Sequence, residues 1–191
     1  MSSSNDPRAQ RSRRALLDTA IELFLENPHT SLLDVAKHAQ VGRATLYRHF
    51  GTREELIEAL AAESMRVTDE ILKPLDDPHR PAIEVLEAGI RALMPIADRF
   101  HFILAIWSLA SPGEPAYELY QSQLDRLAEL IERAKREGAI NANLSTDWVV
   151  MLVDSISQIG WWSIRNGDLD AGQAADQAVI SLLDGIGSCR K

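Results

Sequence analysis

Apolar residues recur at intervals of three and four along almost the whole 191-residue chain. The first series is Leu17, Ala20, Ile21, Phe24 and Leu25, and no segment keeps the apolar–polar alternation of a half-buried β-strand. An interval of three or four places apolar side chains on one face of an α-helix, which a core can then bury. We therefore predict an all-α fold.

Turn and capping signals divide this pattern into about nine helices. Asn27-Pro28, Gly51 and Gly138 each end a helical segment, and Pro95 is expected to kink or break the fifth helix. Asp170 is expected to cap the last helix rather than to bind calcium. The expected helices cover approximately residues 10–27, 31–39, 43–50, 52–73, 81–97, 100–110, 117–137, 146–165 and 170–186.

The segment from residue 38 to residue 56 is rich in cationic and titratable side chains, although the chain has a formal net charge of −8. These side chains are His38, Arg43, Arg48, His49 and Arg53. Residues 1–53 hold eight Lys or Arg against five Asp or Glu, so a basic N-terminal part precedes a strongly acidic body. A basic part of this kind indicates a polyanionic partner, and a chance fluctuation of surface charge is the alternative.

Two short helices joined by a tight turn, the second rich in small and basic residues, are typical of a helix-turn-helix motif. The second helix of that motif enters the major groove of DNA. Gly42, Ala44 and Thr45 leave its leading end thin enough to approach base edges, and Arg43 is long enough to reach a guanine. The side chains suited to phosphate oxygens are Tyr47, His49 and Arg53. Packing and capping roles are the alternatives for the first two of these.

Four stretches within residues 10–60 carry a more specific pattern. They are Leu33-Asp34-Val35-Ala36, Ala39-Gln40-Val41, Thr45-Leu46-Tyr47-Arg48-His49-Phe50 and Arg53-Glu54-Glu55-Leu56. In these stretches the chain resembles the tetracycline-repressor (TetR) family of bacterial transcriptional regulators. The resemblance implies a DNA-binding domain at residues 1–53, with a flexible N-terminal arm, and a helical ligand-binding and dimerisation domain at residues 54–191.

The resemblance also implies roles for individual residues. The DNA-binding residues that it implies are Ser31, Gly42, Arg43, Ala44, Thr45, Tyr47, His49 and Arg53. Four arginines form either an arm that enters the adjacent groove or a solvated basic tail, namely Arg8, Arg11, Arg13 and Arg14. The chain departs from the family at Gln40, where Gly is usual because the turn prefers left-handed backbone, and at Gly42, where a Ser or Thr cap is common. The first departure is expected to cost about 1 kcal/mol.

The helix expected at residues 146–165 should be buried on several of its sides, because Asp154 is the only charged residue between Trp148 and Ile164. A partner helix together with a cavity would cover its several apolar sides. We therefore expect a homodimer through the eighth and ninth helices, with Ala178 and Leu182 in the interface.

Most aromatic residues also lie in the C-terminal body, where each belongs either to the core or to a ligand pocket. For most of them the core is the simpler alternative, and this includes His101. The residues that we expect to line a pocket, if there is one, are His101, Phe102, Trp107, Tyr117, Trp148 and Trp161.

Common catalytic and metal-binding motifs are missing from the sequence. It contains no His-Glu-x-x-His, Cys-x-x-Cys or Gly-x-Ser-x-Gly, and its single cysteine, Cys189, excludes a disulfide framework and a cysteine-based zinc site. We therefore expect no catalytic residues, no metal and no cofactor. The polar N-terminus and the lack of an apolar span of ~20 residues indicate a cytoplasmic protein without a membrane partner.

Three functions are consistent with these patterns. The leading one is a repressor that a small, largely apolar molecule releases from a palindromic operator, so that the partners are double-stranded DNA, an effector and a second copy of the chain. The second is a DNA-binding protein with a filled, ligand-free body. The third is a helical enzyme or carrier whose N-terminal part no longer binds DNA.

Overall fold

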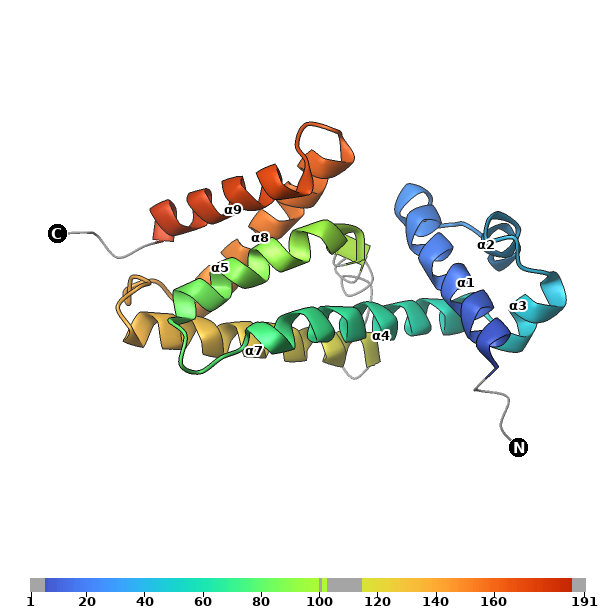
Figure 1. Ribbon diagram of the computed structural model, residues 1–191, viewed down its shortest axis with the longest axis horizontal. Helices are drawn as coiled ribbons and strands as arrows, with labels where there is room; N and C mark the ends of the chain where they lie inside the picture. The colour runs from blue at the N-terminus through green and yellow to red at the C-terminus, as the bar shows by residue number, and fades with distance from the viewer. Residues whose placement is uncertain (1–5, 100, 103–114, 187–191) are drawn as a thin grey trace. The chain divides into compact units, whose positions relative to one another are not determined.

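The computed structural model describes residues 6–99, 101–102 and 115–186, and every regular element in these ranges is helical (Figure 1). The α-helices are α1 (Pro7–Glu26), α2 (Leu32–His38), α3 (Arg43–His49), α4 (Arg53–Leu72), α5 (Ala82–Leu93), α7 (Pro115–Arg136), α8 (Thr146–Arg165) and α9 (Ala171–Ile186). Two short 3₁₀ helices are η1 (Lys73–Leu75) and η2 (Met94–Ile96). The prediction of an all-α fold is confirmed. The helix expected at residues 100–110 lies, except for residues 101 and 102, outside the described residues.

The chain divides into two compact units, Met1–Ser64 and Met65–Lys191. Helix α4 belongs to both, because it begins at Arg53 in the N-terminal unit and ends at Leu72 in the C-terminal unit. The domain boundary expected between residues 53 and 54 falls at the first turn of this helix and stays a prediction.

The core of the N-terminal unit is formed where α1, α2 and α3 pack against one another. Helix α1 contributes the face that its apolar spacing predicted, including Leu17, Ile21 and Phe24. Val35 of α2 and Leu46 of α3 are fully buried against this face. The two short helices therefore hold their places through a few apolar anchors, and the rest of α3 remains at the surface.

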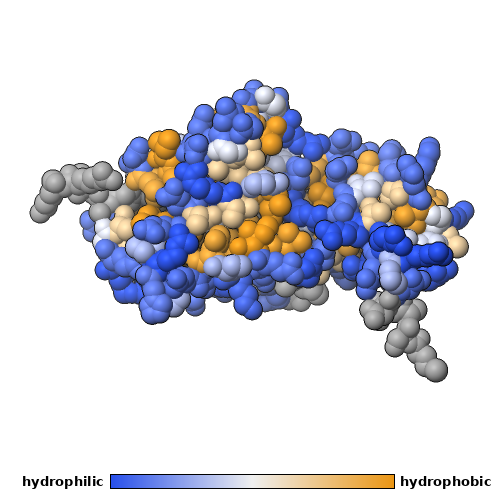
Figure 2. All heavy atoms as spheres, viewed as in Figure 1, coloured by the Kyte–Doolittle hydropathy of each residue, from blue (hydrophilic) through white to orange (hydrophobic). Residues whose placement is uncertain are grey.

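The C-terminal unit is a bundle in which α8 packs against α7 and α9, and α5 packs against the same two helices. In the face seen in Figure 2, apolar side chains gather over the middle of this unit beside strongly hydrophilic ones. Leu182 of α9 is fully buried and Ala178 is nearly so. This corrects our expectation for the interface, because both side chains pack within the protomer and are unavailable to a partner.

Proline breaks the helix that follows residue 81, as predicted. Helix α5 ends at Leu93 and gives way to η2, which contains Pro95. Met94 in this break packs against Gly160 of α8 so closely that a Cβ on Gly160 would lie 2.6 Å from the Met94 sulfur. The absence of a side chain at residue 160 therefore lets α8 approach the break.

Local capping explains where several helices begin. The Trp148 N–H donates to the Ser145 hydroxyl at the start of α8, at 3.2 Å. At the start of α9, Asp170 and Gln173 cap each other through bonds of 2.8 and 3.0 Å, so Asp170 is a helix cap as expected.

Within the described residues, no helix combines the length and apolar character needed to cross a bilayer.

Candidate DNA-binding helix and ligand cavity

Helix α3 is anchored by two buried side chains, Leu46 and, just after the helix, Phe50. Its opposite face is exposed to solvent. Gly42 is its N-cap and makes no side-chain capping bond, as its identity predicts. Arg43 is exposed, and its guanidinium carbon lies 5.7 Å from the centre of the Tyr47 ring one turn later. Tyr47 itself is 45% exposed. A cation and a phenol thus stand together on the free face of α3, and the residues on either side of Arg43, Gly42 and Ala44, are small.

The turn before α3 has the left-handed geometry that we expected. Gln40 has a φ of +55°, the only positive φ at a non-glycine among the described residues. The Val41 N–H donates to the Ala36 carbonyl at 2.8 Å, which closes the turn between α2 and α3. The angle of the motif therefore depends on a residue held in a conformation that favours glycine.

Ser31 lies at the N-terminus of α2 and is already engaged there. Its hydroxyl accepts the Asp34 N–H at 3.2 Å and donates to the Asp34 carboxylate at 2.6 Å. The second bond holds the pKa of Asp34 below its usual range. Ser31 remains exposed, so its cap position does not remove it from the surface.

Arg53 makes contacts that the sequence did not predict. Its guanidinium donates to the Pro28 carbonyl and to the Thr30 carbonyl, the latter at 3.4 Å, and lies 4.8 Å from the centre of the Phe24 ring. These partners come from the end of α1 and the connection to α2. Arg53 therefore ties the start of α4 to that connection, and its contact with phosphate stays a prediction.

His49 is half-buried at the end of α3. Its Nε2 atom is buried without a hydrogen-bond partner among the described residues. Burial lowers its pKa, and the nearby charges of Arg13 and Arg48 lower it further. The ring is therefore neutral at pH 7 and offers one N–H to an acceptor rather than a full positive charge.

The four arginines near the N-terminus lie within α1, so their backbone is helical. All are exposed, and they are Arg8, Arg11, Arg13 and Arg14. Arg13 lies 5.6 Å over the Phe50 ring, whereas Arg14 pairs with Asp18 at 3.8 Å. The described part of this segment is therefore a basic helical surface.

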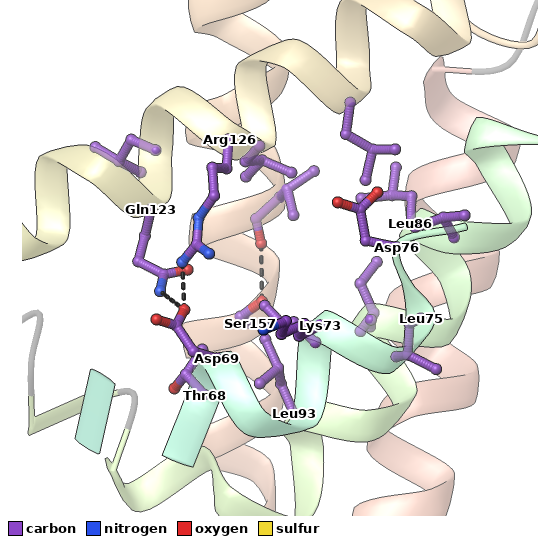
Figure 3. Close-up of a pocket in the computed structure, with 18 of the residues that line it drawn as sticks. Thr68, Asp69, Lys73, Leu75, Asp76, Leu86, Leu93, Gln123, Arg126 and Ser157 are labelled. Carbon is purple, nitrogen blue, oxygen red and sulfur yellow. Dashed lines mark hydrogen bonds and ion pairs between the residues drawn. The ribbon is translucent and has the colours of Figure 1, made fainter. Parts of the chain in front are cut away.

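The C-terminal unit contains a cavity of about 640 Å³ between the last turns of α4, η1, α5, α7 and α8 (Figure 3). Its walls are mainly aliphatic, with Leu72, Leu75, Val85, Leu86, Ile90, Leu93, Leu124, Leu127, Leu130 and Val153 among the lining residues. This volume is within the range of pockets that hold small organic molecules.

Two of the buried polar side chains that line this cavity, Asp154 and Tyr120, are hydrogen-bonded to each other. Asp154 of α8 is only 5% exposed, and its carboxylate accepts the Tyr120 hydroxyl at 2.8 Å and the Gln158 side-chain amide at 3.4 Å. Burial raises the pKa of Asp154, while the two hydrogen bonds oppose that shift. Burial and the neighbouring Asp154 raise the pKa of Tyr120, so its phenol stays protonated and acts as the donor.

Other charged residues of the cavity lie at its exposed edge. Figure 3 shows Gln123 and Arg126 of α7 reaching Asp69 of α4, with the Gln123 amide 2.7 Å from the carboxylate. Arg66 pairs with Glu70 one turn apart on α4. These pairs are half-exposed, so water screens them far more than it screens Asp154.

Five of the six residues that we expected in a pocket are among the described residues, and none of these five lines this cavity. Trp148 is 64% exposed, and Trp107 lies outside the described residues. The His101 ring stacks on Trp161 at 3.5 Å, and the Trp161 indole donates to Asp98 at 2.6 Å. The remaining two, Phe102 and Tyr117, are buried and half-buried. A ligand site at these residues stays a prediction.

Sequence reasoning therefore missed Asp154 and Tyr120 as cavity residues. The available signal was the position of Asp154 as the one charge in an otherwise uncharged segment. A charged residue in such a segment is rarely buried without a partner. Aromatic content drew the prediction toward tryptophans instead, although aromatic residues are as common in cores and interfaces as in pockets.

Comparison with known proteins gives consistent matches. The family model described as "Bacterial regulatory proteins, tetR family" matches residues 16–60. The HTH-type transcriptional repressor LfrR of Mycolicibacterium smegmatis is 26% identical over 178 residues, covering 93% of this chain and 91% of LfrR. The HTH-type transcriptional regulator NfxB of Pseudomonas aeruginosa is 27% identical over 137 residues, covering 68% of this chain and 72% of NfxB.

Solved structures share the fold. LfrR in complex with proflavine has a TM-score of 0.76 at 24% identity, covering 93% of this chain and 97% of that one. AibR in complex with isovaleryl coenzyme A and operator DNA has a TM-score of 0.75 at 22% identity, covering 90% and 98% of the two chains. Three findings point to the same family. They are the family-model match over residues 16–60, the relatives aligned over most of their length, and the shared fold. The chain belongs to the TetR family of bacterial transcriptional regulators, which are DNA-binding proteins and not enzymes.

Proposed function

We propose that the protein is a repressor that a small, largely apolar molecule releases from a palindromic operator. The observation that carries this proposal is the course of α4, which starts four residues after the end of α3 and ends in the wall of the cavity. Helix α4 therefore follows the proposed DNA-reading helix α3 directly in the chain, and the residues of its last turns form part of the cavity wall. A ligand that favours one arrangement of α4 would change DNA affinity by its differential affinity for the two states.

For DNA binding, we infer that the exposed leading end of α3 enters the major groove. Arg43 is placed to reach a base edge, and the small Gly42, Ala44 and Thr45 leave room for the approach. The groups proposed for phosphate contacts are Ser31, Tyr47, His49 and Arg53. AibR, which shares the fold, was solved with operator DNA, and this supports the assignment.

For the effector, the largely aliphatic walls and the volume of about 640 Å³ support a drug-sized apolar molecule. LfrR was solved with proflavine and AibR with isovaleryl coenzyme A, which supports ligand binding in proteins of this fold. The cavity also makes a filled, ligand-free body the weaker alternative.

For assembly, we infer a homodimer through α8 and α9. These helices expose apolar side chains that a monomer would leave in water, namely Trp148, Met151, Ile159, Trp162 and Ile180. A two-fold dimer presents two α3 helices to a palindromic site, which is the usual way in which a single helix-turn-helix gains specificity.

The test is selection of genomic fragments by the purified full chain, followed by direct titration of the recovered sequence. We expect a palindromic site whose affinity falls steeply with salt. A compound that enters the cavity should then lower that affinity. Recovery of no preferred sequence would exclude the proposed function, whereas a site that no cavity ligand affects would leave a DNA-binding protein without the proposed switch.

A further inference from the structure

We propose that the cavity recognises a lipophilic monocation, whose positive charge pairs with Asp154 while its apolar body fills the space between α5 and α7. The proposal rests on the ligand-binding role proposed above and names the chemical class of the ligand. It places charge recognition at one buried carboxylate rather than at the acidic surface of the chain.

Asp154 is the first reason. It is 5% exposed and belongs to the lining of the cavity, yet its two hydrogen-bond partners among the described residues, Tyr120 and Gln158, are neutral. A buried carboxylate that lacks an opposite charge is costly, and a cation that brings its own apolar surface offsets that cost. A neutral ligand offers an ionised carboxylate no such compensation.

The distribution of the other charges is the second reason. The lining residues include three cationic side chains, Arg66, Lys73 and Arg126, and all are exposed. Arg66 and Arg126 pair with acidic groups of α4 at the edge of the cavity. Among the lining residues, the buried charge is therefore negative, and the positive charges lie where water screens them.

Thr68 is the third reason. Its side chain is 1% exposed, lines the same cavity, and has no hydrogen-bond partner among the described residues. Buried hydroxyls are usually paired, so an unpaired one at a cavity wall indicates that a ligand supplies the partner. A ring system with a charged nitrogen and one polar substituent would meet both Thr68 and Asp154.

A purely structural role is the competing explanation for Asp154, because its bond to Tyr120 joins α8 to α7. Asn at this position separates the two explanations. It keeps an oxygen that accepts the Tyr120 hydroxyl but carries no charge. The link between the helices is then retained, and the attraction for a cation is lost.

The experiment is isothermal titration calorimetry of the full chain with two probes of nearly equal shape. N-methylacridinium is a permanent tricyclic monocation, and N-methylacridone is its neutral counterpart. We expect wild type to prefer the cation by about tenfold or more, and Asp154→Asn to reduce cation affinity by about tenfold or more while changing neutral affinity less than about twofold. The matched control is Asp147→Asn, which removes the same charge from an exposed position on the same helix and should change neither affinity.

A second pair of variants leaves Asp154 intact and therefore does not depend on how well its substitution folds. Ser157 lines the cavity one turn after Asp154. Ser157→Lys places a tethered cation beside the carboxylate, whereas Ser157→Met fills a similar volume without charge. We expect the lysine variant to weaken the cation much more than the neutral probe, and the methionine variant to weaken both alike.

Three results would overturn the proposal: equal affinity of wild type for both probes, equal loss of both in Asp154→Asn, or binding of neither probe to wild type. These outcomes differ from failure of the proposed function, because calorimetry is carried out without DNA. If the cation binds through Asp154 but leaves operator affinity unchanged, charge recognition stands and the switch does not.

Discussion

At the level of single residues, the turn between α2 and α3 places a side chain where glycine is favoured. Gln40 has a φ of +55°, and a Cβ in that region crowds the following carbonyl. Arg53 acts in the opposite sense, because its contacts with Pro28, Thr30 and Phe24 hold the connection between α1 and α2. One residue therefore strains the DNA-binding unit and another braces it.

Replacement of Gln40 by Gly should raise the free energy of unfolding by about 0.5–1 kcal/mol, because relief of the left-handed strain exceeds the extra backbone entropy of Gly in the unfolded chain. Urea-induced unfolding measures the change. Gln40→Ala is the control, since it keeps the Cβ and should bring no gain. An equal gain in both variants would show that the amide side chain, and not the backbone, is the source of the strain.

Arg53→Lys keeps the positive charge but cannot reproduce the fork that reaches two carbonyls while lying over Phe24. We expect the free energy of unfolding to fall by about 1 kcal/mol, since hydrogen bonds from a charged donor are lost. Thermal unfolding in the absence of DNA measures this effect. Unchanged stability together with weaker operator binding would assign Arg53 to phosphate instead.

At the level of elements, helix boundaries were predicted best where the signals are local. The predicted bounds of α8 match Thr146–Arg165, because Ser145 caps its start and Asn166-Gly167 forms the turn after it. The partners of Arg53 lie 23 and 25 residues away in sequence, so no local pattern revealed them. Helix α3 combines both cases: its bounds and exposed face follow from the sequence, whereas the contacts that hold it required the folded unit.

For α3, Arg43→Ala should relax the preference for one base position in the operator and cost ~1–3 kcal/mol of binding free energy. Tyr47→Phe, which removes only the hydroxyl, should weaken all sequences to the same degree because a phosphate contact carries no sequence information. Selection and sequencing of bound DNA gives both preference matrices. An unchanged matrix for Arg43→Ala would contradict the placement of Arg43 in the groove.

At the level of the whole molecule, the cavity could not be read from the sequence. Its walls come from residues as far apart as Arg66 and Ser157, and only the packing of the helices in the C-terminal unit brings them together. The same packing buries Leu182 and leaves Ile159 and Trp162 outside. Periodicity predicted which helices are apolar, but not which of their sides faces a neighbour within the protomer.

Ile159→Glu should give folded monomers that no longer bind the operator, because Ile159 is 62% exposed in the protomer and lies in the apolar surface proposed for dimerisation. Light scattering gives the mass and circular dichroism checks the fold. The control is Ser122→Glu, which adds the same charge at an exposed position on α7. A dimer of unaltered mass would place the interface elsewhere.

The walls of the cavity exist only when α4, α5, α7 and α8 are assembled, so a molecule that occupies its roughly 640 Å³ binds the folded protein and not the unfolded chain. By linkage, a ligand at one hundred times its Kd adds about 2.7 kcal/mol to the free energy of unfolding. For a chain of this size that corresponds to a rise in Tm of roughly 5–10 °C. The Tm of the protein therefore reports how fully a ligand occupies the cavity. Candidate effectors can be ranked by the rise in Tm that they cause, before any operator sequence is known.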